Sequence, residues 1–179
     1  CGDADIAKIL FMMKNHEYNC AAVKSDQWYK FQNHRWVEND SGTSLRKAIS
    51  EELRDLYRKK IDDFGLSLCD NNQSEESLKK SESMTNKILE IIMKLSQTTH
   101  KDHIMKEARE LFFDPDQKFM NNLDGDPYLL CFNNGVLDMR TREFRNGRPD
   151  DYLQKCTNID YRKLDRDRSG KTIKEIEDF

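Results

Sequence analysis

The sequence has 179 residues, of which 35% are charged and 36% are hydrophobic, and its formal net charge is −3. This length fits one domain with a sizeable core, and the negative charge argues against a protein that coats nucleic acid over its whole surface. The five cysteines lack the spacing of a zinc site and no stretch is apolar enough to span a membrane, so we expect free thiols in a reducing compartment and no membrane contact.

The first part of the chain predicts a helix followed by a hairpin. Asp3 or Asp5 can cap a helix whose apolar stripe runs from Ile6 to Met13. Two aromatic-rich runs, residues 28–31 and 35–37, flank a short polar turn and predict a β-hairpin. Its two tryptophans could stack on bases, as in single-strand binding proteins, or could cover the core beneath the sheet. The second interpretation is favoured, because aromatic residues on strands usually pack.

Helices are predicted on both sides of a polar connection. A long amphipathic helix begins at Thr43 and ends near Gly65. Residues 70–83 are polar and serine-rich, which predicts a mobile connection or at best the start of a helix. Residues 88–95 carry apolar side chains at helical spacing and predict a buried helix.

One more helix is predicted before the chain turns into strands. Thr99 and Asp102 resemble a capping box at its start, and the pair Asp114-Pro115 ends it. The apolar residues between Phe119 and Leu123 then predict a further helical turn.

The stretch from Tyr128 to Tyr161 predicts a small antiparallel sheet. The pair Asn134-Gly135 follows an apolar run and tolerates the positive φ that a two-residue turn needs. A second turn is predicted at residues 140–142, and Pro149 ends the last strand because proline cannot donate to a ladder. The predicted fold class is therefore α+β, with a helical body and two small antiparallel β-hairpin sheets in a single domain, residues 1–179.

The same stretch carries a resemblance to a known family. The segments Asn-Gly-Val-Leu-Asp-Met, Thr-Arg-Glu-Phe-Arg, Arg-Pro-Asp-Asp-Tyr and Thr-Asn-Ile-Asp-Tyr follow one another in residues 134–161. The chain resembles the domain that precedes the superfamily 3 helicase in poxvirus-type and other large-DNA-virus helicase-primases, with phage and plasmid primases as cousins. The resemblance is most specific over residues 112–161 and extends more loosely back to Asp5.

The resemblance implies a segment of a longer protein that acts in viral DNA replication. That parent would be an NTP-dependent DNA helicase fused to a primase, working as a ring that is expected to be a hexamer. The parent would bind ATP and Mg²⁺, and no cofactor is expected in this segment. The segment would be a non-catalytic collar between primase and ATPase that supports ring assembly and guides DNA, and alone it would bind DNA weakly. The expected location is the host-cell cytoplasm, at the viral replication site, or the nucleus.

One segment of the sequence resembles part of a nucleotide-binding motif. Ser169-Gly170-Lys171-Thr172 looks like the end of a phosphate-binding loop. However, Asp165 occupies the place of the first glycine, and the preceding residues are charged where a buried strand is needed. We therefore predict no nucleotide site and no catalytic residue in this chain.

Two groups of residues could hold a metal ion. Two acidic pairs precede the second hairpin: Asp114 with Asp116, and Asp124 with Asp126. Asp-Pro also stops helices and Asp-Gly-Asp-Pro is typical of turns, which is the favoured interpretation. His100 and His103 share a helix face, but neither a carboxylate nor a cysteine lies at a suggestive spacing, so they are expected to be solvated polar residues. No metal site is predicted.

Six basic residues are the candidate contacts to nucleic acid or to a neighbouring subunit: Arg140, Arg142, Arg145, Arg148, Lys30 and Arg35. Four of them lie in the second hairpin, where guanidinium groups would project from a turn and one strand face toward phosphates. Interleaved acids could instead pair with them on the surface. Arginines clustered beside exposed aromatic residues would favour DNA guidance. Arginines buried in ion pairs, or a large apolar face, would favour the alternative function, an adaptor that joins primase and helicase without touching DNA.

Overall fold

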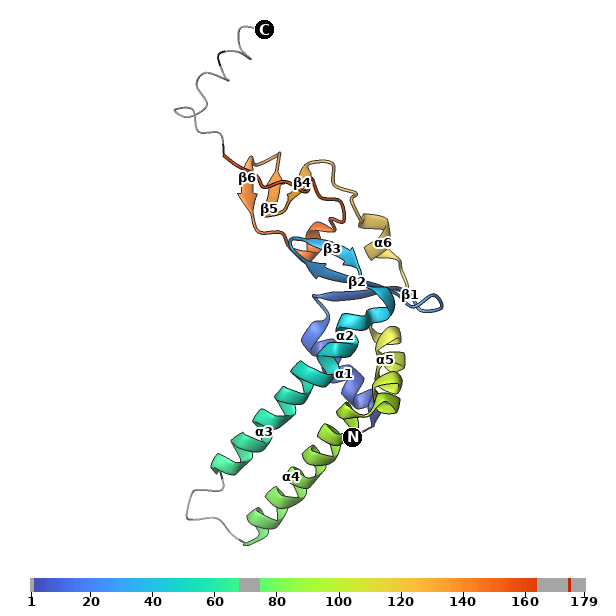
Figure 1. The fold of residues 1–179 in the computed structure, drawn as a ribbon, viewed down its shortest axis with the longest axis vertical. Coiled ribbons are helices and arrows are strands. Elements are labelled where there is room, and N and C mark those ends of the chain that lie inside the picture. The colour runs from blue at the N-terminus through green and yellow to red at the C-terminus, as the bar shows by residue number, and fades with distance from the viewer. Residues whose placement is uncertain (1, 68–74, 164–173, 175–179) are drawn as a thin grey trace. The chain divides into compact units, whose positions relative to one another are not determined.

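The computed structural model describes residues 2–67, 75–163 and 174, and its chain divides into two compact units. The first unit contains residues 1–32 and 36–122, and the second contains residues 33–35 and 123–179. Each unit carries one three-stranded sheet, and the first also carries the long helices (Figure 1). The predicted α+β class is therefore confirmed, whereas the single domain stays a prediction.

Two helices of the first unit pack side by side: α1 (Asp3–Lys14) and α5 (Thr98–Phe112). The Asp5 carboxylate accepts a hydrogen bond of 2.9 Å from the N–H of Gly2, which helps to begin α1. The rings of Phe11 and Phe112 meet edge to face with their centroids 5.0 Å apart. The ring contact fixes the end of α1 against the end of α5.

The start of α5 differs from its prediction. The helix begins at Thr98, so Thr99 lies inside it and not at the capping position, and the predicted capping box of Thr99 and Asp102 is wrong. The residue that does precede the helix, Gln97, makes no side-chain capping bond. The Asp102 carboxylate instead pairs with the guanidinium of Arg46, which lies on another helix. This ion pair uses the oxygens that a capping box would have needed.

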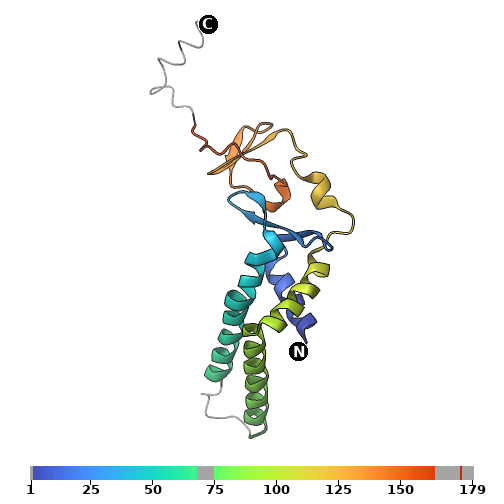
Figure 2. The ribbon, with the colours of Figure 1, turned by 45° about the vertical axis from the view of Figure 1, so that its right-hand side comes forward.

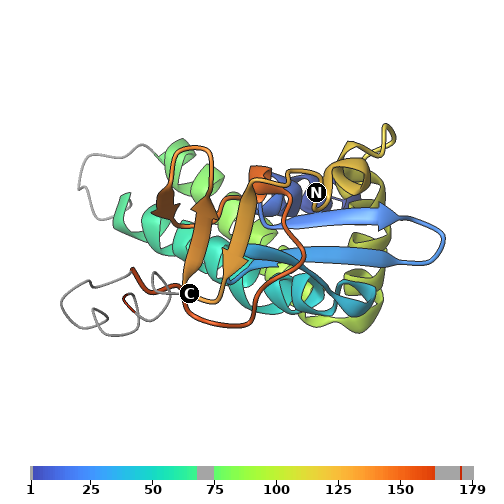
Figure 3. The same cartoon turned by 90° about the horizontal axis from the view of Figure 1, so that it is seen from above.

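The first sheet has the strand order β1 (Tyr18–Ala22), β2 (Gln27–Gln32) and β3 (Arg35–Glu38), and Figure 3 shows β1 and β2 side by side. A bulge separates Cys20 from Ala22 in β1. Asn33 and His34 connect β2 to β3 with φ values of +50° and +68°. Positive φ at both residues is the geometry of a two-residue hairpin turn, so the first predicted hairpin is confirmed.

A long helical hairpin extends from this sheet (Figure 2). Its first arm consists of α2 (Thr43–Ala48), a π-helical segment (Ile49–Leu53) and α3 (Arg54–Ser67), and its second arm is α4 (Glu75–Ser96). Of the predicted connection over residues 70–83, residues 70–74 lie outside the described residues, and residues 75–83 form the first turns of α4. Among the helices that the structure describes, none is both long and apolar enough to cross a membrane.

The core of the first unit joins all of these elements. Its buried side chains come from α1, the first sheet and the helices up to α5, and they include Ile6, Leu10, Trp28, Leu45, Ile49, Leu53, Leu95 and Ile104. The Trp28 side chain is fully buried, and Trp36 is 4% exposed. Both tryptophans therefore pack, as the favoured interpretation expected, and neither offers a free ring for base stacking. The short helix α6 (Lys118–Asn122) ends this unit.

The second sheet has the strand order β4 (Leu129–Phe132), β5 (Gly135–Asp138) and β6 (Glu143–Arg145). A 3-10 turn, Pro149–Asp151, follows it. The residues of the first turn are Asn133 and Asn134, since Phe132 pairs with Gly135. The predicted pair Asn134-Gly135 is therefore displaced by one position, and the positive φ, +157°, belongs to Gly135 as the first residue of β5.

We expect Gly135→Val to lower the free energy of unfolding by about 1–3 kcal/mol. A Cβ at Gly135 would lie 2.6 Å from the ring of Phe144 and 2.7 Å from the carbonyl oxygen of Arg145. That carbonyl belongs to the neighbouring strand and cannot move without disturbing the ladder. Hydrogen exchange of the amides in β4 to β6 measures the loss. Gly125→Val is the control, because Gly125 is exposed and has no positive φ. Unchanged protection in Gly135→Val would contradict this turn geometry.

Candidate nucleic-acid interface

The second sheet buries one face. Residues directly opposite one another on neighbouring strands share a face, and Cys131, Val136 and Arg145 form such a row across β4, β5 and β6. Leu153 packs against Cys131 and Val136, and all three are at most 4% exposed. Arg145 therefore projects from the covered face of the sheet, and its charge needs a partner inside the protein.

Arg145 has that partner in Asp151. Two nitrogens of its guanidinium group donate to the two carboxylate oxygens of Asp151 at 2.7 and 2.8 Å. The N–H of Arg148 donates to the same carboxylate at 2.8 Å. The Asp151 side chain is 8% exposed and that of Arg145 is 18% exposed. The hydrogen bond from Asp151 raises the pKa of Arg145 further above its ordinary value. Arg145 is thus a structural residue of the second unit.

Arg140 is half-exposed and lies between two carboxylates. Its guanidinium pairs with Asp126 and lies 3.5 Å from a carboxylate oxygen of Asp138. The ring of Tyr128 lies beneath it, with the Arg140 Cζ 5.1 Å from the ring centroid. The N–H of Arg140 and its positive charge lower the pKa of Asp138. The geometry combines an exposed aromatic ring with an arginine whose charge is largely balanced.

Arg142 and Arg148 are exposed. Arg142 stands in the turn between β5 and β6 with φ +58°, and it has no ion pair with another residue that the structure describes. The Arg148 backbone is anchored by Asp151, while its side chain is exposed. Of the four arginines in this region, Arg142 and Arg148 thus have exposed side chains, and Arg142 stands in the turn itself.

The two remaining basic candidates belong to different units. Lys30 lies in β2 of the first unit, and its ammonium group is 5.5 Å from the centroid of the Tyr18 ring. Arg35 is assigned to the second unit together with the hairpin turn that precedes it. Whether Lys30 and Arg35 contact nucleic acid or a subunit stays a prediction.

The opposite face of the second sheet is half-exposed and apolar. We call it the aromatic face and define it by Leu130, Phe132, Phe144 and Tyr161. The Phe144 and Tyr161 rings stack with centroids 4.5 Å apart, and Phe132 meets Tyr161 at 5.3 Å. Leu130 is 37% exposed. This face is not among the predicted contacts, although the alternation of side chains along the predicted strands could have indicated it.

The acidic pairs make turn and capping interactions. Asp114 accepts hydrogen bonds from the N–H groups of Asp116 and Phe119 at 3.1 and 2.9 Å. Asp124 accepts bonds from the N–H groups of residues 154 and 155, at 2.8 and 3.0 Å. Asp126 accepts a bond of 3.0 Å from Tyr128 N–H. Asp114 and Asp126 therefore act as the turn interpretation expected. Asp124 instead holds a segment 30 positions further along the chain, and Asp116 pairs with Lys118 at 3.3 Å.

The histidine pair has a carboxylate neighbour that sequence spacing did not indicate. Asp3 of α1 lies within hydrogen-bonding distance of both His100 and His103. His103 is exposed, as expected for a solvated polar residue, whereas the carboxylate partner of the two rings was not expected. Residues 169–172, which resemble the end of a phosphate-binding loop, lie outside the described residues.

The chain is similar to viral proteins. The family model described as "D5 N terminal like" matches residues 7–179. "Putative helicase L207/L206" of Acanthamoeba polyphaga mimivirus is 39% identical over 176 residues, which cover 97% of this chain and 18% of that protein. "Putative helicase 022R" of Frog virus 3 (isolate Goorha) is 29% identical over 184 residues, which cover 87% of this chain and 19% of the relative. The chain thus spans about a fifth of the length of these curated relatives.

These matches test the resemblance to the helicase-primases of large DNA viruses. The family model includes the whole motif-bearing stretch of residues 134–161, and the relatives are viral proteins named as helicases. The resemblance is therefore confirmed. Because the match extends over nearly all of its length, the chain belongs to the D5 N-terminal-like family.

Proposed function

We propose that this chain is a non-catalytic segment of a viral DNA helicase-primase, N-terminal to the ATPase, that supports ring assembly and guides DNA during replication. The relatives named as helicases are about five times longer than this chain, which leaves ample length outside it for an ATPase with ATP and Mg²⁺. The proposed location is intracellular and reducing, at the site of viral replication in the host cytoplasm or in the nucleus. The buried free thiols of Cys20 and Cys131 support this setting.

The exposed turn between β5 and β6 is the observation that supports DNA guidance. Arg142 stands there without an ion pair among the described residues, and Arg140 beside it is 51% exposed. A helicase must move along any sequence, so the contacts of such a turn would be to phosphates. Phosphate contacts release counterions, and binding would weaken steeply with salt.

We expect Arg142→Glu to weaken binding of single-stranded DNA and to reduce the slope of log affinity against log salt by about 0.7 for each phosphate that the turn no longer neutralises. Fluorescence anisotropy at several salt concentrations measures both, first with this chain and then with the full-length protein. Lys60→Glu, on an exposed face of α3, is the control because it makes the same change in charge. Equal binding by both variants and the wild type would contradict DNA contact at this turn.

Two observations favour the second candidate function, the adaptor. Arg145 is paired with Asp151, and Arg140 lies between two carboxylates, so the charge of two of the four arginines is balanced within the protein. The aromatic face is the kind of half-exposed apolar surface that protein contacts use. Leu130→Glu would place a charge on that face. Light scattering measures assembly of the full-length protein with this substitution. If Leu130→Glu prevents assembly while Arg142→Glu leaves DNA binding unchanged, the adaptor is established and DNA guidance is rejected.

A further inference from the structure

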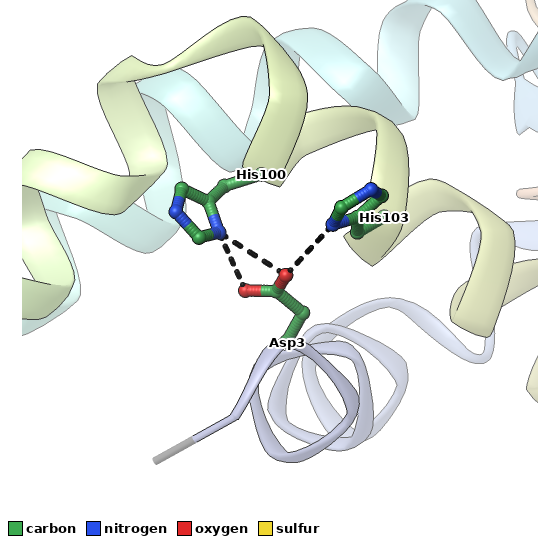
Figure 4. Close-up of side chains that lie close together, drawn as sticks. All are labelled: Asp3, His100 and His103. Carbon is green, nitrogen blue, oxygen red and sulfur yellow. Dashed lines mark hydrogen bonds and ion pairs between the residues drawn. The ribbon is translucent and has the colours of Figure 1, made fainter.

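The carboxylate of Asp3 lies between two imidazole rings of α5 (Figure 4). His100 Nδ1 is 3.0 Å from one oxygen of Asp3 and 3.1 Å from the other, and His103 Nδ1 is 3.3 Å from the second oxygen. One ligand atom from each residue lies within 4.8 Å of the other two. The side chains of Asp3, His100 and His103 are 20%, 30% and 60% exposed, so an ion could enter from solvent.

The fold brings these three groups together without help from an ion. Asp3 is the first residue of α1, and the two histidines lie one turn apart on the same face of α5. Ile6 on α1 and Ile104 on α5 are fully buried in the same core, which fixes the distance between the helices. A ligand that binds here does not have to order a mobile segment, and this lowers the entropic cost of binding.

Two imidazoles and one carboxylate are a ligand set of borderline divalent cations, whereas Mg²⁺ and Ca²⁺ prefer sites made of oxygen atoms. Metal–ligand bonds of about 2.0–2.1 Å at tetrahedral angles place ligand atoms about 3.3 Å apart. The Asp3 Oδ2 atom lies 3.1 Å from His100 Nδ1 and 3.3 Å from His103 Nδ1, which is close to that spacing. Only the separation between the histidines must shrink, and His103 is exposed enough to turn.

We propose that Asp3, His100 and His103 form a binding site for a divalent cation of the Zn²⁺ class, which joins the beginning of α1 to α5. The remaining coordination position would hold water. Each imidazole would bind the ion through Nδ1 and carry its proton on Nε2, because a neutral imidazole coordinates through its unprotonated ring nitrogen. This proposal does not rest on the proposed function.

Cysteine thiols are the main competitors for such an ion, because thiolates bind Zn²⁺ strongly. Burial raises the pKa of Cys20 to about 11. Burial and the neighbouring Cys156 raise the pKa of Cys131 to about 12. Both thiols therefore stay protonated at neutral pH and are poor ligands there. Spectroscopy with Co²⁺ in place of Zn²⁺ distinguishes a cysteine site from the proposed site. Thiolate ligands add charge-transfer absorption that nitrogen and oxygen ligands do not give.

The experiment is calorimetric titration of the chelator-treated chain with Zn²⁺, followed by Co²⁺ spectroscopy. We expect one site per chain, Co²⁺ spectra without thiolate bands, and a rise in the thermal midpoint of about 5–10 °C when Zn²⁺ is present at 100 times its dissociation constant. His100→Ala/His103→Ala should weaken Zn²⁺ binding by at least about tenfold, since outer-shell partners alone contribute 10–100-fold. His16→Ala, at a histidine outside the cluster, should bind Zn²⁺ like the wild type.

Asp3→Asn keeps the shape of the side chain while removing its charge, and it should also bind Zn²⁺ more weakly. Circular dichroism in the presence of chelator establishes that each variant is folded before it is titrated. The proposal is overturned if the wild type does not bind Zn²⁺. It is also overturned if the folded double variant binds as tightly as the wild type, which would place the ion on other ligands, and thiolate bands in the Co²⁺ spectrum would identify those ligands as cysteines.

Discussion

Trp28→Ala is expected to lower the free energy of unfolding by about 3–5 kcal/mol. The indole is fully buried beneath the first sheet, and its ring meets that of Phe112 with centroids 5.6 Å apart. Its Nε1–H donates to a carboxylate oxygen of Asp26 at 2.9 Å. Truncation removes this packing, leaves a cavity and leaves Asp26 without that donor. All three effects destabilise the folded state.

Urea unfolding followed by far-ultraviolet circular dichroism measures this loss. Trp28→Phe keeps most of the ring contact with Phe112 but loses the donor to Asp26, so we expect about 1–2 kcal/mol. Met12→Ala is the surface control, since Met12 is 74% exposed, and its effect should stay within about 0.5 kcal/mol. If both Trp28 variants lost the same free energy, packing of the indole would not be the dominant contribution.

The elements that sequence predicted well are those with a strong hydrophobic period. The apolar stripe from Ile6 to Met13 and the aromatic strands around Asn33-His34 lie close to where the pattern placed them. These signals are local, because each depends on residues within one or two turns of helix or one hairpin. The second turn was displaced by one residue because Asn133-Asn134 and Asn134-Gly135 both have turn chemistry.

The features that sequence missed depend on contacts between distant segments. The sequence leaves open whether the polar residues 75–83 are a connection or the start of a helix, because they have no apolar period, and in the structure they form the first turns of α4, which packs along α3. Asp3 meets His100 across 97 positions of sequence, so no spacing rule could pair them. Whether the four arginines of the second hairpin contact nucleic acid or a subunit stays a prediction. The difference between Arg145, which is largely covered and paired with Asp151, and Arg142, which is exposed, became visible only with the register of β5 against β6.

Asp151→Ala is expected to lower the free energy of unfolding by about 2–4 kcal/mol. Removing one partner of a fully buried ion pair costs about 3–5 kcal/mol, and we expect a smaller effect here because the Arg145 side chain is 18% exposed. The substitution removes the two hydrogen bonds to the Arg145 guanidinium and the one from the Arg148 N–H. Arg145 would then hold a charge on the covered face of the sheet without its carboxylate partner. Arg142→Ala, in the same region but exposed, is the matched control and should change stability little.

The ion pair between Asp151 and Arg145 should also make the stability of the second sheet depend on pH at acidic pH. Burial by itself would raise the pKa of Asp151, but the hydrogen bonds from Arg145 and from the Arg148 N–H outweigh it, and the pKa in the folded state is lowered. The pKa in the unfolded state is about 3.9 and therefore higher. The stabilisation is complete above that value and is lost as the pH falls through the folded-state pKa.

The difference in unfolding free energy between the wild type and Asp151→Asn should therefore stay constant from pH 7 to about pH 5 and shrink below about pH 4. Both tryptophans lie in the first unit, so their fluorescence does not report on the second sheet. Hydrogen-exchange protection of the amides in β4 to β6, corrected for the intrinsic exchange rate at each pH, reports on it directly. A difference that persisted unchanged to about pH 2 would show that the Asp151 carboxylate does not stabilise the sheet through its charge.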